Sequence, residues 1–228
     1  MNVCIIPARG GSKRIHKKNI KLFCGKPIVE WTYQQVRKSG CFEQILISSD
    51  DSEIIQTAKG LGISAPFVRP LSLADDHTPT RAVINHAINY LLSCGYTLDY
   101  VCCVYPTACF ITAGDLVDSF KLLTSSDTSF VFSAATYPYP IQRAFRISSN
   151  GHCERLNPEH RFTRSQDLED RYHDAGQFYW GHYQAFLDNI DCVSSNGTPF
   201  VIPRERVHDI DTAEDWSLAE RLFKATYQ

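Results

Sequence analysis

Short apolar runs rich in β-branched residues alternate with stretches of helical period through the first two thirds of the chain. This alternation most constrains the fold, because strands joined by helical crossovers pair in parallel and their helices cover both faces of the sheet. The sequence therefore predicts an α/β fold with a mostly parallel sheet. The expected strands are residues 3–6, 44–48, 66–69, 100–105 and 129–133.

The segments between these runs carry the helical pattern. In residues 79–94, for example, Ile84, Ala87, Ile88 and Leu91 share one helical face. Glycines follow three of the segments, where a left-handed residue ends a helix. We expect helices at residues 27–38, 52–60, 79–94 and 112–123, ended in three cases by Gly40, Gly62 and Gly95.

The pattern changes after Ala134. The run Tyr137-Pro138-Tyr139-Pro140 excludes a regular helix, and Asn150-Gly151 is typical of a two-residue hairpin turn between residues 144–148 and 153–156. These features predict an antiparallel arm at about residues 135–171, inserted in a single domain of residues 1–228. Further strands are expected at residues 177–183 and 200–202, followed by a last helix that Thr212 caps and that buries Trp216, Ala219, Leu222 and Phe223.

The charge and composition exclude several classes of protein. With 43% hydrophobic and 21% charged residues the chain has the composition of an ordinary globular protein. Its net charge of -2 provides no overall positive electrostatic field for binding nucleic acid. No apolar run is long enough to cross a membrane, and the first one is too short for a signal peptide. Nine cysteines without a CxxC pair indicate reduced thiols. We expect a cytoplasmic protein.

The loop after the first strand is rich in glycine and positive charge. Gly10 and Gly11 permit close approach of backbone N–H groups to an anion, and Arg9, Lys13 and Lys18 add charge. In an open α/β sheet this loop lies at the carboxyl end of a strand, where ligands bind. The pattern favours a phosphate site, although it matches neither a P-loop nor a dinucleotide fingerprint. A tight turn with a solvated basic surface stays open as the alternative.

A second group of polar residues is Asp209-Ile210-Asp211-Thr212. In an extended segment both carboxylates lie on one side, and carboxylates of this kind suit Mg²⁺, which takes further ligands from water and substrate phosphates. The alternative is that Asp211 or Thr212 only caps the final helix.

A third group spans residues 164–180 and combines Arg164, Gln166 and Asp174 with several aromatic residues. An arginine, amides and carboxylates together suit a carboxylated polyhydroxy ligand. The alternative is a structural His173-Asp174 pair within plain aromatic core.

Three motifs resemble those of the CMP-sialic acid synthetases, the acylneuraminate cytidylyltransferases: residues 5–15, 17–20 and 209–212. The similarity spans almost the whole chain, and residues 132–133, 139–144, 165–169 and 172–181 are most similar to the pseudaminic acid branch of the family. The resemblance implies a Rossmann-like nucleotidyltransferase fold. It also implies a bacterial, Mg²⁺-dependent cytidylyltransferase that converts CTP and pseudaminic acid into CMP-pseudaminic acid and pyrophosphate, for example for flagellin glycosylation.

The resemblance also implies roles for individual residues. Lys18, Asp209 and Asp211 would be catalytic, and the two aspartates would hold the metal. Residues implied to bind the nucleotide are Ala8, Arg9, Gly10, Gly11, Ser12, Lys18, Asn19 and Arg69. Residues implied to bind the sugar are Tyr105, Gln142, Arg143, Arg164, Gln166, Asp167, Tyr172, Asp174 and Gln177. Family members are homodimers, and the arm would reach the partner's active site.

Some positions depart from the family pattern. His16 and Cys109 stand where relatives commonly have proline, and Tyr105 replaces a glutamine of the neuraminic acid enzymes. N-acetylneuraminic, legionaminic or another 2-keto acid sugar stays open as the substrate, as does, from a different class, a catalytically inactive CTP-binding regulatory protein.

Overall fold

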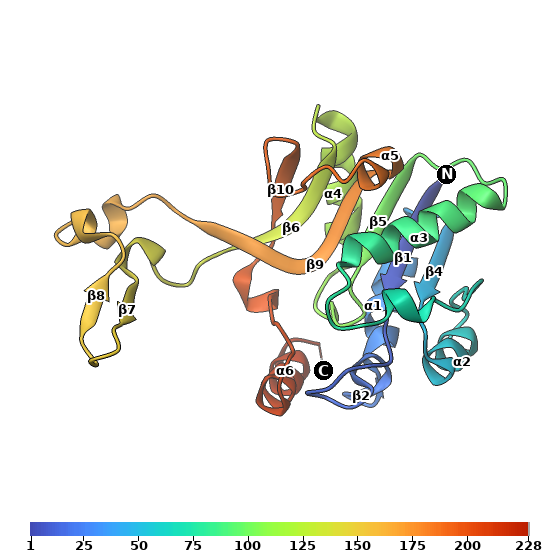
Figure 1. Ribbon diagram of the computed structural model, residues 1–228, viewed down its shortest axis with the longest axis horizontal. Helices are drawn as coiled ribbons and strands as arrows, with labels where there is room; N and C mark the ends of the chain where they lie inside the picture. Colours follow the sequence, from blue (N-terminus) through green and yellow to red (C-terminus); the bar gives the residue numbers. More distant parts are fainter. Residues whose placement is uncertain (228) are drawn as a thin grey trace.

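A six-stranded sheet, in the order β10-β6-β9-β5-β1-β4, forms the centre of the computed structural model, which describes residues 1–227 (Figure 1). Only β9 runs antiparallel to its two neighbours, so the predicted mostly parallel sheet is confirmed. The strands are β1 (Asn2–Pro7), β4 (Gln44–Ser48), β5 (Tyr100–Val104), β6 (Phe130–Thr136), β9 (Tyr172–His182) and β10 (Gly197–Val201).

Helices cover both faces of this sheet, as the alternation predicts (Figure 1). In β1, Cys4 and Ile6 pack toward α1, α2 and α4, whereas Val3 and Ile5 pack toward α3 and α5. A strand buried on both faces reads as a continuous apolar run, which is how β1 appears in the sequence. The helices are α1 (Ile28–Ser39), α2 (Ser52–Gly60), α3 (Thr80–Ser93), α4 (Ala113–Ser125), α5 (Tyr183–Leu187) and α6 (Ala213–Tyr227).

The predicted helix ends are confirmed. Gly40, Gly62 and Gly95 follow α1, α2 and α3 with φ of 65°, 83° and 84°, in the left-handed region. At the start of α6 the hydroxyl of Thr212 accepts the N–H of Asp215, whose carboxylate accepts the N–H of Thr212 in return. Gln228 lies outside the described residues.

The last helix has a core of its own. Trp216, Ala219 and Phe223 of α6 pack on Ile15, Phe23 and Ile28, next to the loop that follows β1. A tight hairpin, β2 (Leu22–Phe23) with β3 (Lys26–Pro27), supplies Phe23 through a turn in which Cys24 and Gly25 both have positive φ. This hairpin and α5 were not predicted from the sequence, because both are too short to show a period.

The strand expected at residues 66–69 does not form. Pro66 and Pro70 lack the backbone N–H group that pairing in a sheet needs. Isolated backbone contacts link this part of the chain to the edge of the sheet instead. The N–H of Arg69 donates to the carbonyl of Ser49 at 2.8 Å, and an isolated bridge joins Leu46 to Ser64.

The inserted arm extends away from the sheet (Figure 1). Its tip is a hairpin, as predicted, formed by β7 (Phe145–Ile147) with β8 (Cys153–Arg155), but residues 148–152 join the strands, so the expected two-residue turn was wrong. Gly151 takes φ 82° in this longer turn. The arm leaves at the end of β6 and returns as the start of β9, so these two strands form its base. Among the described residues, no helix combines the length and apolar character needed to cross a membrane.

Candidate active site

A cavity of about 320 Å³ opens at the carboxyl end of β1. Three segments far apart in the sequence line it: the loop after β1, residues 69–83, and residues 105–107 after β5, with Asp211 joining them. Of the residues singled out in the sequence, the cavity brings together Arg9, Ser12, Lys18, Asn19, Arg69, Tyr105 and Asp211.

Gly10 lets the basic loop lie against the start of α2. A Cβ on Gly10 would lie 2.7 Å from the Cβ of Asp51, the residue that caps α2, so a side chain would clash there. The N–H of Gly10 donates to Asp50 at 3.0 Å, and that of Ala8 to the carbonyl of Ser48 at 2.9 Å. Gly11 has open space around its Cβ position. Ala8 and Gly10 therefore support the loop from behind, and Gly11 is its exposed part.

Lys18 joins the basic loop to the acidic segment. Its Nζ donates to the carbonyl of Ile210 at 2.7 Å and to Asp211 at 3.1 Å. Arg14 donates to the other oxygen of Asp211 at 2.6 Å. Buried Asn19 holds the loop from inside, donating to the carbonyl of Arg9 at 3.0 Å. Residues 192 positions apart in sequence thus meet at one edge of the cavity.

Asp209 and Asp211 flank Ile210, and of the two only Asp211 is among the described residues that line the cavity. Ile210 is buried in the core under α6. Burial, together with the charge of Asp211, raises the pKa of Asp209 above its usual value. A cation would relieve this repulsion, so the pair fits a divalent metal. Within the described residues no group of three or more His, Cys, Asp or Glu side chains is arranged to hold one, and Mg²⁺ here would take further ligands from water and phosphate.

Arg69 is the most enclosed cation of the cavity, only 3% exposed. Its Nε donates to the hydroxyl of Ser48 at 3.1 Å, and its Nη2 to the carbonyl of the same residue. Burial lowers the pKa of Arg69 to about 10, so the guanidinium stays charged at neutral pH. Because these bonds fix it in place, Arg69 presents a positioned positive charge to the cavity.

An acidic segment that was not predicted from the sequence, Asp75 and Asp76, contacts the basic loop. Asp76 accepts a hydrogen bond from Arg9 and forms a salt bridge with Lys13, and the carbonyl of Asp75 accepts from Arg9 at 3.0 Å. The Asp75 side chain fixes the turn by accepting from the N–H and hydroxyl of Thr78. The sequence Asp-Asp-His-Thr-Pro signals a turn before α3, but nothing local shows that it folds back over residues 9–13.

Three of the residues implied for the sugar lie near the cavity or behind it. Tyr105 lines the cavity, and its N–H donates to the carbonyl of Gln177 at 3.0 Å. Gln177 is buried, and its amide donates to the carbonyl of Arg206 at 2.7 Å. Asp174 accepts the hydroxyl of Tyr179 at 2.6 Å. Phe178 and Trp180 are core residues, so the plain-core alternative is right for these two aromatics.

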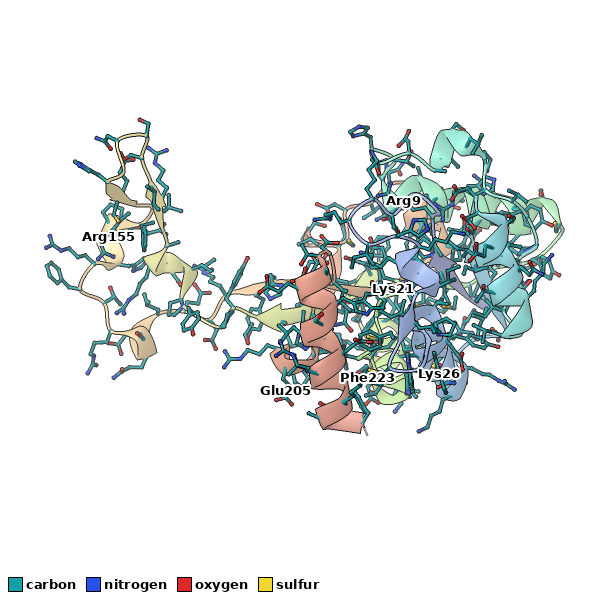
Figure 2. The ribbon with its side chains drawn as sticks, turned by 90° about the horizontal axis from the view of Figure 1, so that it is seen from below. Arg9, Lys21, Lys26, Arg155, Glu205 and Phe223 are labelled. Carbon is teal, nitrogen blue, oxygen red and sulfur yellow. The ribbon has the colours of Figure 1, made fainter. Side chains whose placement is uncertain are left out.

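The other six lie on the arm or at its base: Gln142, Arg143, Arg164, Gln166, Asp167 and Tyr172. They hold the arm together or face outward. Gln142 donates to the carbonyl of Glu169 at 2.7 Å, Arg164 pairs with Asp167 at 2.8 Å, and Tyr172 is exposed. Figure 2 shows Arg155 of the arm far from Arg9 at the cavity. One chain alone does not bring the arm to its own cavity.

The chain is similar to known proteins in both sequence and fold. Residues 3–184 match the family model described as Cytidylyltransferase. The chain is 41% identical over 227 residues to the pseudaminic acid cytidylyltransferase of Campylobacter jejuni, covering 100% of this chain and 98% of that one. It is 28% identical to the CMP-N,N'-diacetyllegionaminic acid synthase of Legionella pneumophila, covering 97% and 96%. Among solved structures, a CMP:2-keto-3-deoxy-manno-octonic acid synthetase complexed with CTP has a TM-score of 0.73 at 14% identity, covering 98% of each chain.

Proposed function

The chain belongs to the cytidylyltransferase family, and we propose that it transfers the CMP group of CTP to pseudaminic acid and releases pyrophosphate. The observation that carries the proposal is the cavity itself, where a basic loop, an aspartate from the acidic pair and a neutral tyrosine meet at the end of β1. The identity to the Campylobacter enzyme over the full chain supports the choice of sugar.

The reaction needs charge stabilisation and alignment more than covalent catalysis. The anomeric hydroxyl oxygen of the sugar forms a bond to the α-phosphorus, the bond from this phosphorus to the bridging oxygen breaks, and pyrophosphate leaves with that electron pair. The hydroxyl proton is released. Negative charge on the phosphate oxygens must be balanced throughout.

Different residues of the cavity would bind the triphosphate, the metal ion and the sugar. Lys18, Arg9 and Arg69 would bind the triphosphate as fixed positive charges, and exposed Gly11 would offer its N–H group. Asp209 and Asp211 would hold Mg²⁺, which supplies Lewis-acid stabilisation of the phosphate oxygens. Tyr105 would face the sugar, because it lines the same cavity without adding charge.

We also propose that two chains form each complete site. The arm carries exposed apolar side chains, Phe145, Ile147, Leu156 and Phe162, which are 57%, 72%, 58% and 86% accessible in the single chain. Apolar surface of this kind commonly marks an interface. In a homodimer the arm of one chain would bring Arg164, Gln166 and Tyr172 to the sugar in the other. The protein would be a single catalytic domain that works in the cytoplasm, where CTP is made.

The test is pyrophosphate release from CTP and Mg²⁺ with pseudaminic acid, run beside N-acetylneuraminic acid, legionaminic acid and a control without sugar. Release with pseudaminic acid alone is the expected result. Release with another sugar would keep the reaction and change the substrate. CTP binding without release for any sugar would favour a non-catalytic regulatory protein.

A further inference from the structure

Hydrogen bonds hold Tyr105 in place through both its hydroxyl and its backbone. Its hydroxyl lies 2.9 Å from the hydroxyl of Thr80, the first residue of α3, and forms a hydrogen bond with it. Its backbone is fixed on both sides, since its N–H donates to Gln177 and its carbonyl accepts from Ala108, each at 3.0 Å. Ring and hydroxyl therefore have little freedom at the cavity wall.

Tyr179 supports the ring of Tyr105 from behind. The two rings meet edge to face, with centroids 6.0 Å apart and planes at 86°. Such a contact restricts the swing of the Tyr105 ring. Tyr179 is itself anchored, because its hydroxyl donates to Asp174 at 2.6 Å.

An irregularity in β9 creates this anchor. Pairing with β6 passes from Tyr179 opposite Phe132 to Asp174 opposite Ala134, so the extra residues of β9 bulge out. Gly176 takes φ 60° in the bulge, and the hydroxyl of Ser133 accepts the N–H groups of Gln177 and Phe178. Bulges of this kind redirect side chains near functional sites. Here the bulge brings Asp174 level with the hydroxyl of Tyr179.

The surroundings of Tyr105 differ in charge from the rest of the cavity. Arg9 and Lys13 gather around Asp76, and Arg14 and Lys18 around Asp211. At Tyr105 the cavity is lined by the neutral side chains of Thr80 and Thr107, and the carboxylate whose charge reaches Tyr105, that of Asp174, accepts the hydroxyl of Tyr179. Burial is the main cause that raises the pKa of Tyr105 to about 12, so this hydroxyl stays protonated at neutral pH. The Tyr105 hydroxyl suits an uncharged hydroxyl or amide group of a ligand, whereas the cationic side chains of the cavity suit phosphates.

We propose that Thr80 and Tyr179 are positioning residues that fix the hydroxyl of Tyr105 where it hydrogen-bonds an uncharged polar group of the acid sugar. The inference rests on the proposed function, because it concerns the second substrate of that reaction. It assigns to Thr80 and Tyr179 an effect on sugar recognition that acts through Tyr105. CTP binding at the cationic groups is left unaffected.

The decisive experiment compares Thr80→Val with Thr80→Ser in steady-state kinetics. Valine keeps the shape and removes the hydroxyl, so KM for the sugar rises about fivefold, the value of one ordinary hydrogen bond. KM for CTP and kcat stay within about twofold of wild type, and serine restores the KM for the sugar. Tyr179→Phe raises the same KM by about threefold, since it loses the bond to Asp174. Thr124→Val, on the exposed end of α4, is the matched control.

Two kinetic outcomes would overturn the inference: an equal effect of valine and serine, or a rise in KM for CTP instead of the sugar. A crystal structure of Thr80→Val gives a readout that does not depend on turnover. A displaced Tyr105 ring supports the positioning role, and an unmoved ring overturns it. If the wild-type protein turns over no sugar at all, the proposed function fails by itself, and this crystal structure still decides the role of Thr80.

Discussion

Arg9 and Asp76, 67 residues apart in sequence, are joined by a hydrogen bond of 2.6 Å from Nη1 to Oδ1. The same carboxylate pairs with Lys13, and these two cations hold the pKa of Asp76 below its usual value. Both cations belong to the loop that we propose binds triphosphate. The charge of Asp76 therefore occupies groups that an anionic ligand would use.

Replacing Asp76 with asparagine is expected to strengthen CTP binding. The change removes a negative charge that competes for Arg9 and Lys13, and because exposed pairs of this kind contribute little, the expected gain in CTP affinity is at most about fivefold. Isothermal titration with CTP at low and at high salt measures the effect, which should shrink with salt. Asp118→Asn, whose carboxylate pairs with Lys121 on the exposed side of α4, is the control. Weaker CTP binding in Asp76→Asn would instead show that this carboxylate organises the loop.

Replacing Asp211 with asparagine is expected to lower kcat on the order of 10²-fold or more, the size of a lost electrostatic stabiliser. Asp211 lies against Lys18 and Arg14, so its charge also sets the position of both cations. Single-turnover pyrophosphate release with saturating CTP measures the step. Asp188→Asn, at the end of α5, controls for a general effect of losing a carboxylate. Near-normal activity in Asp211→Asn would remove this residue from the metal site.

The arm is expected to control both the oligomeric state and activity. Charged substitutions at its exposed apolar residues, Phe145→Asp with Ile147→Asp, should convert a dimer into a monomer, since an interface does not tolerate unpaired charges. Light scattering after size-exclusion chromatography measures the mass. Ser149→Asp, at the exposed turn of the same hairpin, is the control, because it adds a charge to the arm without replacing an apolar side chain. A double variant that stays dimeric and active would contradict the two-chain site.

The pair Arg206 and Asp115 is expected to stabilise the fold in a pH-dependent way. Arg206 donates to both carboxylate oxygens of nearly buried Asp115, where the core under α6 meets the start of α4. Arg206→Met leaves that carboxylate unpaired and should lower the free energy of unfolding by about 2–4 kcal/mol at pH 7. Urea unfolding measures this difference, with Arg221→Met on the exposed side of α6 as the control.

The acid dependence follows from the pKa of Asp115. Burial alone would raise it, but hydrogen bonds from Arg206 and Thr112 hold it below its usual value. As pH falls, the unfolded chain takes up the proton first, at about 3.9. The contribution of the pair is therefore complete above about pH 4 and is lost as pH falls through the lowered pKa. The difference between wild type and Arg206→Met should narrow at pH 3.5; a constant difference would argue against the ion pair.

Gly181 in β9 is expected to tolerate no side chain. A Cβ there would lie 2.5 Å from the ring of Phe130 and 3.0 Å from that of Phe186, two rings already packed edge to face. Gly181→Ala should lower the free energy of unfolding by about 1–3 kcal/mol through overpacking. Gly60→Ala in α2, where nothing lies within 4 Å, should be neutral or slightly stabilising and is the control. Thermal unfolding compares the two, and equal melting temperatures would contradict the prediction.

The layers of the fold follow from the sequence pattern. In a strand such as Val3 to Ile6, successive side chains face opposite helical layers, because the side that a residue faces repeats every two residues on a strand and every 3.6 on a helix. Capping and left-handed glycines are local too, so Thr212, Gly40 and Gly62 could be placed correctly. The three motifs were sufficient to indicate the family.

Which distant groups meet depends on the packing of the whole chain. The strand expected at residues 66–69 was wrong, because edge position and flanking prolines outweigh an apolar run. The contact of Asp76 with Arg9, the bulge that brings Asp174 to Tyr179, and the distance of the arm from the cavity depend on loop paths and chain crossovers. No local periodicity records these paths, since they follow from the packing of whole elements against one another.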